Sequence, residues 1–346
     1  MAAEKKGVNT AYKKLLADIA AGTPEHLYVF YGEESYLKSH YLGKLRELCA
    51  GDFAEFNSAE LEGDRLSAEE FFDATDSLPF GSERKIVTVR DFKLMQPPAD
   101  FKERLPELFA AMPEYLCLVF WFDAQEFKPD KRLAIYKALE KHGQLVDFEP
   151  ASGAELTSWL RRRFKAAGKS IGADACEYMM FLCGASMTNL ITEVEKIAAG
   201  TPGAEVTRQD IDRLGSRVLE ADIFQLTDLL AEKKYGPALV KLRELFDMQN
   251  APAAVLGAVA RQYQRLYGAR LAADERKGEA YVAEMFGFRS SYPARRLVAG
   301  ASRMSLAALR RAQELCMETD LAVKSNMPDA ERALELLLLR LSQVGK

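Results

Sequence analysis

The chain has 346 residues, of which 48% are apolar and 28% are charged, and its formal net charge is −4. This length and composition are typical of a globular protein with two or three domains. No segment has the run of about 20 apolar residues that a membrane-spanning helix requires, and the N-terminal residues lack the apolar stretch of a secretory signal. We therefore expect a cytoplasmic protein that makes no contact with a membrane.

The charge is distributed unevenly along the chain. Residues 1–150 carry 19 Lys and Arg residues against 27 Asp and Glu residues, whereas residues 151–346 carry 28 against 24. An acidic first part is a poor surface for binding DNA on its own. The second part includes a basic run at 161–165, which predicts at most weak contact with a phosphate backbone.

The cysteines and histidines form no recognisable metal or redox motif. The five cysteines contain no CxxC pair, and the three histidines contain no HxxxH or HExxH motif. No GxSxG motif indicates a serine nucleophile either. We therefore expect neither a metal nor another cofactor. Cys117 and Cys176 lie in apolar surroundings, which predicts that both are buried thiols.

The first 150 residues alternate between apolar runs and helical patterns, which is typical of a parallel sheet built from βαβ units. The run Tyr115–Phe122 is an uninterrupted apolar run, and so predicts a strand buried on both faces. Ser67 and Glu70 have the spacing of a capping box. The predicted strands are Leu27–Tyr31, Phe53–Asn57, Ile86–Val89, Tyr115–Phe122 and Gln144–Phe148, and the predicted helices are 11–21, 36–48, one opened by Ser67, Phe101–Met112 and Lys131–Lys141.

The alternating pattern ends at Pro150, and no strand is predicted after it. The apolar terminal segment Leu334–Leu341 is too short to span a membrane and suits the core of a helical bundle. We predict an α/β domain at 1–150, a small helical domain at 151–214 and a C-terminal helical bundle at 215–346. The predicted helices are Ala154–Ala167, Ala173–Cys183, Met187–Ala199, Arg208–Leu214 and a longer set between Asp222 and Val344.

The turn after the first predicted strand is similar to a phosphate-binding loop. The P-loop motif requires Gly, four residues, Gly-Lys and then Ser or Thr, so that backbone N–H groups surround the phosphates. Gly32, Lys38 and Ser39 stand at the required positions, but Leu37 replaces the second glycine. A leucine side chain fills the space of the phosphate and resists positive φ. Two acidic residues after Gly32 add unfavourable charge. From the motif alone, a coincidental match on an ordinary strand–turn–helix remains an alternative.

A second candidate site is the helix break DSLPFG at 76–81. Pro79 and the glycine after Phe80 prevent a helix from continuing. Leu78 and Phe80 are large apolar residues, and two such side chains held outward on a rigid turn would anchor a partner's pocket. The alternative is that both point into the core beneath the sheet.

Six stretches resemble the bacterial DNA polymerase III delta subunit family, and they follow the family's order over almost the whole chain. They are LYVFYGEESYL, SLPFGSERKIV, FKPDKRLAIYKAL, FLCGASMTNLITEVEKI, ARQYQRLYGAR and ALRRAQELCMETDLAVKS. This resemblance implies a clamp-loader subunit with an AAA+-like α/β domain, a small helical domain and a C-terminal collar. It also implies that the P-loop is degenerate and that this chain catalyses no reaction.

A second feature of the nucleotide site points the same way. An active site of this class requires two acidic residues after a buried strand, to hold magnesium and polarise water. Asp91 follows the strand Ile86–Val89 after one residue, but Phe92 occupies the position of the second acid. Gly32 and Asp91 are therefore interpreted as turn residues rather than ligands.

The resemblance also implies partners. The family's delta subunit contacts the ring-shaped beta sliding clamp through an apolar wedge before the third strand, which corresponds here to Leu78, Pro79 and Phe80. Pro79 departs from the family's plain Leu-Phe pair. The resemblance implies that the collar joins the gamma/tau and delta-prime subunits, that primed DNA is bound within the assembled complex, and that ATP hydrolysis belongs to the partner subunits.

Two alternative functions remain at this point. One is an active AAA+ ATPase with an unusual P-loop, which Leu37 and Phe92 disfavour. The other is a DNA-binding adaptor that acts through the more basic second part. Nucleotide binding by the isolated protein would favour the first, and a steeply salt-dependent affinity for DNA would favour the second.

Overall fold

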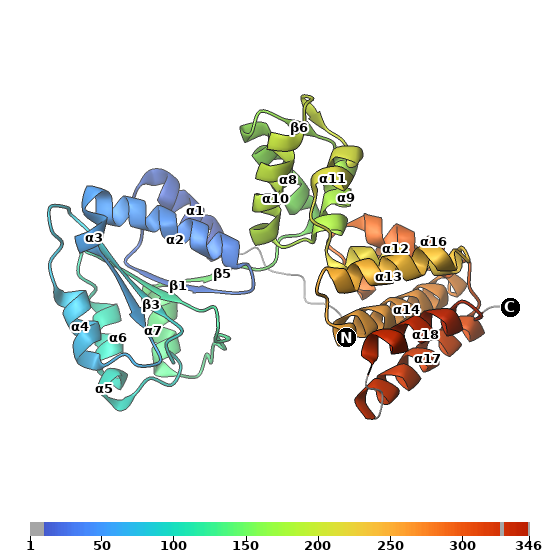
Figure 1. Cartoon of the computed structure of the whole chain (residues 1–346). Helices are drawn as coiled ribbons and strands as arrows, with labels where there is room; N and C mark the ends of the chain where they lie inside the picture. Colours follow the sequence, from blue (N-terminus) through green and yellow to red (C-terminus); the bar gives the residue numbers. More distant parts are fainter. Residues whose placement is uncertain (1–9, 326–328, 345–346) are drawn as a thin grey trace. The chain divides into compact units, whose positions relative to one another are not determined.

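The computed structural model of the protein describes residues 10–325 and 329–344 (Figure 1). They separate into two compact units, with the division between Ala151 and Ser152. The first unit is an α/β domain and the second is almost entirely helical. The further division of the second unit near residue 214 stays a prediction. Within the described ranges, no helix combines the length and apolar character needed to cross a membrane.

The first unit contains a five-stranded parallel sheet with the strand order β2-β3-β4-β1-β5. Every residue of β4 is buried, which confirms the prediction of a strand covered on both faces. Such strands consist of apolar residues because neither face meets water. The strands are β1 (Leu27–Tyr31), β2 (Ser58–Glu62), β3 (Lys85–Arg90), β4 (Leu116–Trp121) and β5 (Gln144–Asp147).

Helices cover both faces of this sheet and create two hydrophobic cores. Successive side chains of a strand point to opposite faces. Leu118 and Phe120 accordingly join the core under α4 to α7, whereas Cys117 and Val119 join the core under α1 and α2 (Figure 1). The helices are α1 (Thr10–Ala21), α2 (Ser35–Ala50), α3 (Ala54–Asn57), α4 (Ala68–Asp76), α5 (Ala99–Lys102), α6 (Arg104–Ala110) and α7 (Ala134–His142).

Two predictions for the first unit were wrong in detail. The segment Phe53–Asn57 was predicted as a strand. In the structure, Phe53 is the last residue of a short 3-10 helix, and the four residues after it form α3, so β2 begins only at Ser58. Tertiary hydrogen bonds of the buried Asn57 side chain, described below, overrode the local pattern. The predicted helix Phe101–Met112 is broken at Glu103, because Pro106 lacks an N–H group and is tolerated only in the first turn of a new helix.

The second unit is built from eleven described helices. The apolar segment of α18 behaves as predicted, because Leu334, Leu337, Leu338 and Leu341 are all buried. The helices are α8 (Gly153–Ala166), α9 (Ala173–Cys183), α10 (Met187–Gly200), α11 (Arg208–Leu214), α12 (Leu219–Ala231), α13 (Tyr235–Asp247), α14 (Pro252–Asp274), α15 (Glu279–Met285), α16 (Ser291–Ala301), α17 (Leu306–Ser325) and α18 (Ala330–Leu341).

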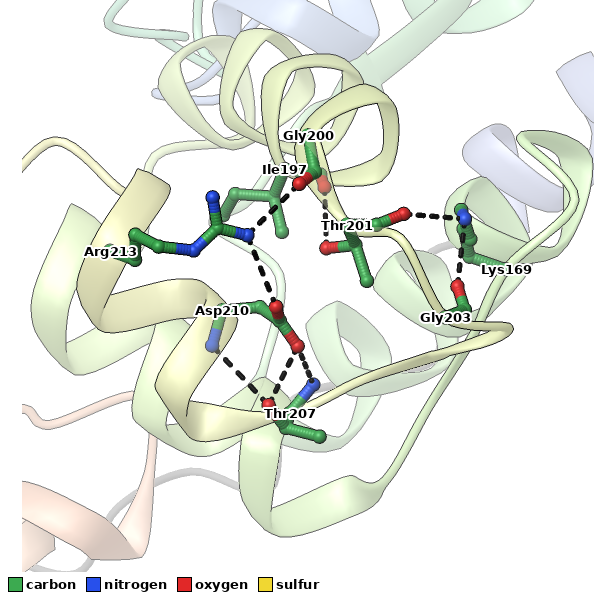
Figure 2. Close-up of polar contacts among 8 residues, drawn as sticks. All are labelled: Lys169, Ile197, Gly200, Thr201, Gly203, Thr207, Asp210 and Arg213. Carbon is green, nitrogen blue, oxygen red and sulfur yellow. Dashed lines mark hydrogen bonds and ion pairs between the residues drawn. The ribbon is translucent and has the colours of Figure 1, made fainter.

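The expectation that no strand follows Pro150 was also wrong. Two-residue strands β6 (Ser170–Ile171) and β7 (Glu205–Val206) pair in parallel. Strands this short carry no periodic pattern, so they depend on tertiary contacts. Figure 2 shows one source of these contacts: the amine of Lys169 donates to the carbonyl oxygens of Thr201 and Gly203, both at 2.7 Å, and so fixes the turn that leads into β7.

Candidate functional site

The loop between α4 and β3 exposes the two apolar side chains that the sequence singled out. Leu78 is 77% exposed and Phe80 is 60% exposed, so neither contributes to the core beneath the sheet. Gly81 has φ of +63°, a conformation that glycine adopts without strain, and it turns the chain towards β3. Pro79, which lies between the two apolar residues, fixes its own φ and stiffens the loop. The role of these three residues in clamp binding stays a prediction.

Buried Asn57 holds the backbone of this loop in place. Its Nδ2 donates to the carbonyl oxygen of Phe80 at 2.8 Å, and its Oδ1 accepts from the N–H of Phe80 at 2.7 Å. The same Nδ2 donates to Ser82 Oγ at 2.8 Å. One side chain therefore satisfies both backbone groups of Phe80 and holds the backbone from which its ring projects. Asn57 is only 1% exposed, so water competes weakly for these bonds.

Buried Lys85 fixes the other end of the loop. Its amine donates to the carbonyl oxygen of Ala74 at 2.6 Å, to Ser77 Oγ at 2.7 Å, and to the carbonyl oxygen of Ser77. A cation at a helix C-terminus interacts favourably with the helix dipole, and these carbonyls close α4. Burial lowers the pKa of Lys85, with the opposing field of Asp76 as the smaller effect. The chain thus leaves α4 in one fixed direction immediately before Leu78.

Two further aromatic residues join Phe80, and the sequence analysis did not identify them as site residues. Phe56 is 71% exposed, and its ring centroid lies 5.2 Å from that of Phe80. The Phe53 ring meets Phe80 edge-on at 5.6 Å, and a Cβ at Gly81 would lie 2.8 Å from it. The available signal was the spacing of three between Phe53 and Phe56, which places both on one face of a helical turn.

The P-loop-like turn directs its lysine into the protein. Lys38 is 1% exposed, and its Nζ donates to the carbonyl oxygen of Phe122 at 2.7 Å and to Asp123 Oδ1 at 2.9 Å. Ser35 Oγ donates to the same Asp123 oxygen at 2.7 Å. These bonds to Ser35 and then Lys38 lower the pKa of Asp123. The carboxylate of Asp123 thus accepts the hydrogen bond that Lys38 would donate to a phosphate oxygen in an active site.

The other motif residues of this turn have roles in the fold rather than positions for binding a phosphate. Gly32 has φ of +101°, and a Cβ there would lie 2.5 Å from Asp147 Oδ1. Leu37 is half-buried and packs against the core under α1 and α2, whereas Ser39 is exposed. Gly32 and Lys38 therefore lie at the places that the P-loop motif requires. Leu37, at the place of the second glycine, packs against the core instead.

Asp91 and Phe92 also stabilise the fold. The carboxylate of Asp91 accepts the backbone N–H groups of residues 123, 124 and 125 at 2.9, 3.2 and 3.0 Å. It thereby shapes the loop after β4. Phe92 is 2% exposed and belongs to the core under α4 to α7.

A cavity of about 620 Å³ lies next to this turn, at the carboxyl ends of β1, β4 and β5. Its lining includes five carboxylates, and none of its described lining residues is basic. Like charges repel, so this cavity disfavours a polyphosphate. Among the described residues, no group of His, Cys, Asp and Glu is arranged to hold a metal ion. The acidic lining residues are Glu33, Asp123, Glu126, Asp147 and Glu149.

The cysteines resemble neither a redox site nor a metal site. All five are buried, which confirms the prediction for Cys117 and Cys176. Burial raises the pKa of Cys176 to about 12, which keeps its thiol protonated and unreactive.

The five-stranded parallel sheet and the helix that follows β1 after a short turn agree with the expected AAA+-like α/β domain, and a helical unit follows this domain. The family model described as DNA polymerase III, delta subunit matches residues 28–149, and the model of its C-terminal domain matches residues 220–341. The chain belongs to the DNA polymerase III delta subunit family, which confirms the resemblance found in the sequence.

Individual relatives agree with this assignment. DNA polymerase III subunit delta of Bacillus subtilis (strain 168) is 23% identical over 92% of this chain and 94% of its own length. A probable DNA polymerase III subunit delta of Aquifex aeolicus (strain VF5) is 29% identical over 74% and 73%. The solved structure of the Bacillus subtilis DNA clamp loader delta protein has a TM-score of 0.61 at 21% identity, and covers 96% of this chain and 99% of that one. At this identity the structural likeness shows the fold.

Proposed function

We propose that this chain is the clamp-opening subunit of a bacterial DNA polymerase III clamp loader. In this proposal Leu78, Pro79 and Phe80 form a wedge that binds the beta sliding clamp and destabilises one interface of the ring. The observation that carries the proposal is the exposure of Leu78 and Phe80 on a loop that buried Asn57 holds in place. Rigid apolar anchors of this kind bind partner pockets with little loss of conformational entropy.

The opening of the ring follows from differential affinity. A ligand shifts an equilibrium only by the difference between its affinities for the two states. The wedge therefore opens a ring interface if it binds the open form of that interface more tightly than the closed form. A rigid loop favours this discrimination, because it cannot adjust its shape to the closed form.

We further propose that the chain hydrolyses no nucleotide and that its P-loop is not functional. In an active P-loop the lysine reaches the terminal phosphates. Here the amine of Lys38 is buried and donates hydrogen bonds to the carbonyl oxygen of Phe122 and to the carboxylate of Asp123. The lining of the neighbouring cavity includes five carboxylates. Both observations disfavour the alternative of an active ATPase, so ATP hydrolysis is assigned to the partner subunits.

The helical residues after about 214 are proposed as the collar that joins the gamma/tau and delta-prime subunits. This proposal keeps the predicted division into 1–150, 151–214 and 215–346, and places primed DNA in the assembled complex. It is supported by large apolar side chains that remain exposed on α13, α17 and α18, because such residues are common in subunit interfaces. They are Val240, Met317, Leu321, Leu336 and Leu339.

The test is direct binding of the purified full-length chain to the cognate sliding clamp, combined with release of that clamp from circular DNA. We expect a stable complex in the absence of nucleotide and faster clamp release when the chain is added. A chain that does not bind the clamp would overturn the proposal. A chain that binds without accelerating release would overturn the opening step alone.

A further inference from the structure

Four exposed apolar side chains gather at one end of the first unit, and we refer to them as the aromatic patch. They come from two segments that are separate in the sequence: Phe53 and Phe56 precede β2, and Leu78 and Phe80 precede β3. Ring contacts of Phe53 and Phe56 with Phe80 join the two segments.

The exposure of Phe56 is not explained by folding. Burying apolar area stabilises a protein, but 71% of this residue stays exposed, so its ring contributes little to the core. The residue that follows it, Asn57, is in contrast only 1% exposed, and its side chain is hydrogen-bonded to the backbone N–H and C=O of Phe80. The position of Phe56 relative to Phe80 is therefore fixed by the hydrogen bonds of its neighbour. A partner that receives Phe80 meets Phe56 at the same moment.

The exposed charges on the two segments that carry the aromatic patch have one sign. Four acidic residues within three positions of a patch residue are exposed, whereas the two basic residues of segments 51–57 and 76–85 are turned inward. Arg84 donates to the carbonyl oxygen of Pro24 at 2.6 Å, and Lys85 donates to carbonyl oxygens at the end of α4. The acidic residues are Asp52, Glu55, Asp76 and Glu83.

We propose that Phe56 is a further anchor of the clamp-binding surface, and that the receiving pocket on the clamp is apolar with a rim of Lys and Arg side chains. This inference rests on the proposed function, because it assigns Phe56 to the same partner as Leu78 and Phe80. The pocket must accept two aromatic rings whose centroids are 5.2 Å apart, together with Leu78. A basic rim complements the acidic border and accelerates association through electrostatic attraction.

The experiment measures clamp affinity and the unfolding midpoint of the full-length Phe56→Ala variant. We expect affinity to fall about tenfold, as for an interface anchor, while the unfolding midpoint stays unchanged. Met248→Ala is the matched control, because Met248 is 61% exposed but lies in the second unit. This control is expected to bind the clamp as the unaltered chain does.

A charge variant tests the rim. Asp52→Asn combined with Glu55→Gln should slow association at low salt and should make the association rate less dependent on salt. An association rate with an unchanged salt dependence would overturn the basic rim.

The outcomes separate this inference from the proposed function. If the unaltered chain binds the clamp and Leu78 and Phe80 are needed, but Phe56→Ala binds equally well, Phe56 is no anchor and only the inference fails. If the unaltered chain does not bind the clamp, the proposed function itself fails. If the unfolding midpoint of Phe56→Ala falls together with affinity, Phe56 acts through folding and the inference is again wrong.

Discussion

Two loops of the first unit show opposite uses of side chains at strand ends. The P-loop-like turn after β1 contains residues typical of phosphate chemistry, yet its lysine is buried against Phe122 and Asp123. The loop before β3 contains residues typical of a core, yet Leu78 and Phe80 stay exposed. Residue types at a loop therefore do not decide its function. What decides it is which groups the surrounding structure has already paired and which it leaves available to a partner.

The largest expected effect comes from removing the apolar side chains of the loop before β3. Replacing Leu78 and Phe80 together by Ala should weaken clamp binding about a thousandfold, because each anchor contributes about 2 kcal/mol and about 1.4 kcal/mol is a factor of ten. The unfolding midpoint should stay the same, because both side chains are exposed. Binding is measured by surface plasmon resonance and unfolding by circular dichroism. Unchanged affinity would remove both residues from the site.

The next effect tests whether the loop must be held rigid. Asn57→Ala leaves the backbone N–H and C=O of Phe80 without their partner, which should cost about 1–3 kcal/mol of unfolding free energy. Clamp affinity should fall as well, because the freed loop loses entropy on binding. Denaturant unfolding and clamp titration of the same sample measure both quantities. Asn250→Ala, which removes a single bond to a carbonyl in the second unit, should lower stability without lowering clamp affinity.

The P-loop-like turn should give the opposite pattern. Lys38→Met keeps most of the buried side chain but removes its bonds to Phe122 and Asp123, which should cost about 1–2 kcal/mol of stability. Clamp loading by the reconstituted complex should stay unchanged, because the lysine serves the fold and holds no nucleotide. A folded variant with a large loss of loading would show that the turn has a nucleotide-dependent role.

The smallest effect is a pH dependence at the same turn. Hydrogen bonds from Ser35 and Lys38 hold the pKa of Asp123 below its ordinary value. A carboxyl with a lowered folded-state pKa stabilises the fold above its unfolded pKa of about 3.9, and this contribution is lost as the pH falls through the folded-state value. Asp123→Asn should therefore flatten the loss of stability below about pH 4. Denaturant midpoints between pH 2 and 6 measure the slope, and an unchanged slope would contradict the assignment.

The sequence by itself determined the alternation of strands and helices, because apolar periodicity reports which faces must be buried. The buried strand β4 and the apolar face of α18 were predictable for that reason. The same local reasoning identified the loop at 76–81 and the altered P-loop, since Pro79, Gly81 and Leu37 limit what the backbone can do.

Only the tertiary structure decided how the two loops are used. The Asn57 side chain is hydrogen-bonded to Phe80, 23 positions away in the sequence, and the Lys38 side chain is hydrogen-bonded to Asp123, 85 positions away. No local pattern encodes a side-chain hydrogen bond to a group so distant in the sequence. The Asn57 bonds also hold the segment before β2, which forms α3 instead of the predicted strand and leaves Phe56 exposed beside Phe80. Exposure results from what the rest of the chain leaves uncovered, and for that reason periodicity could not reveal it.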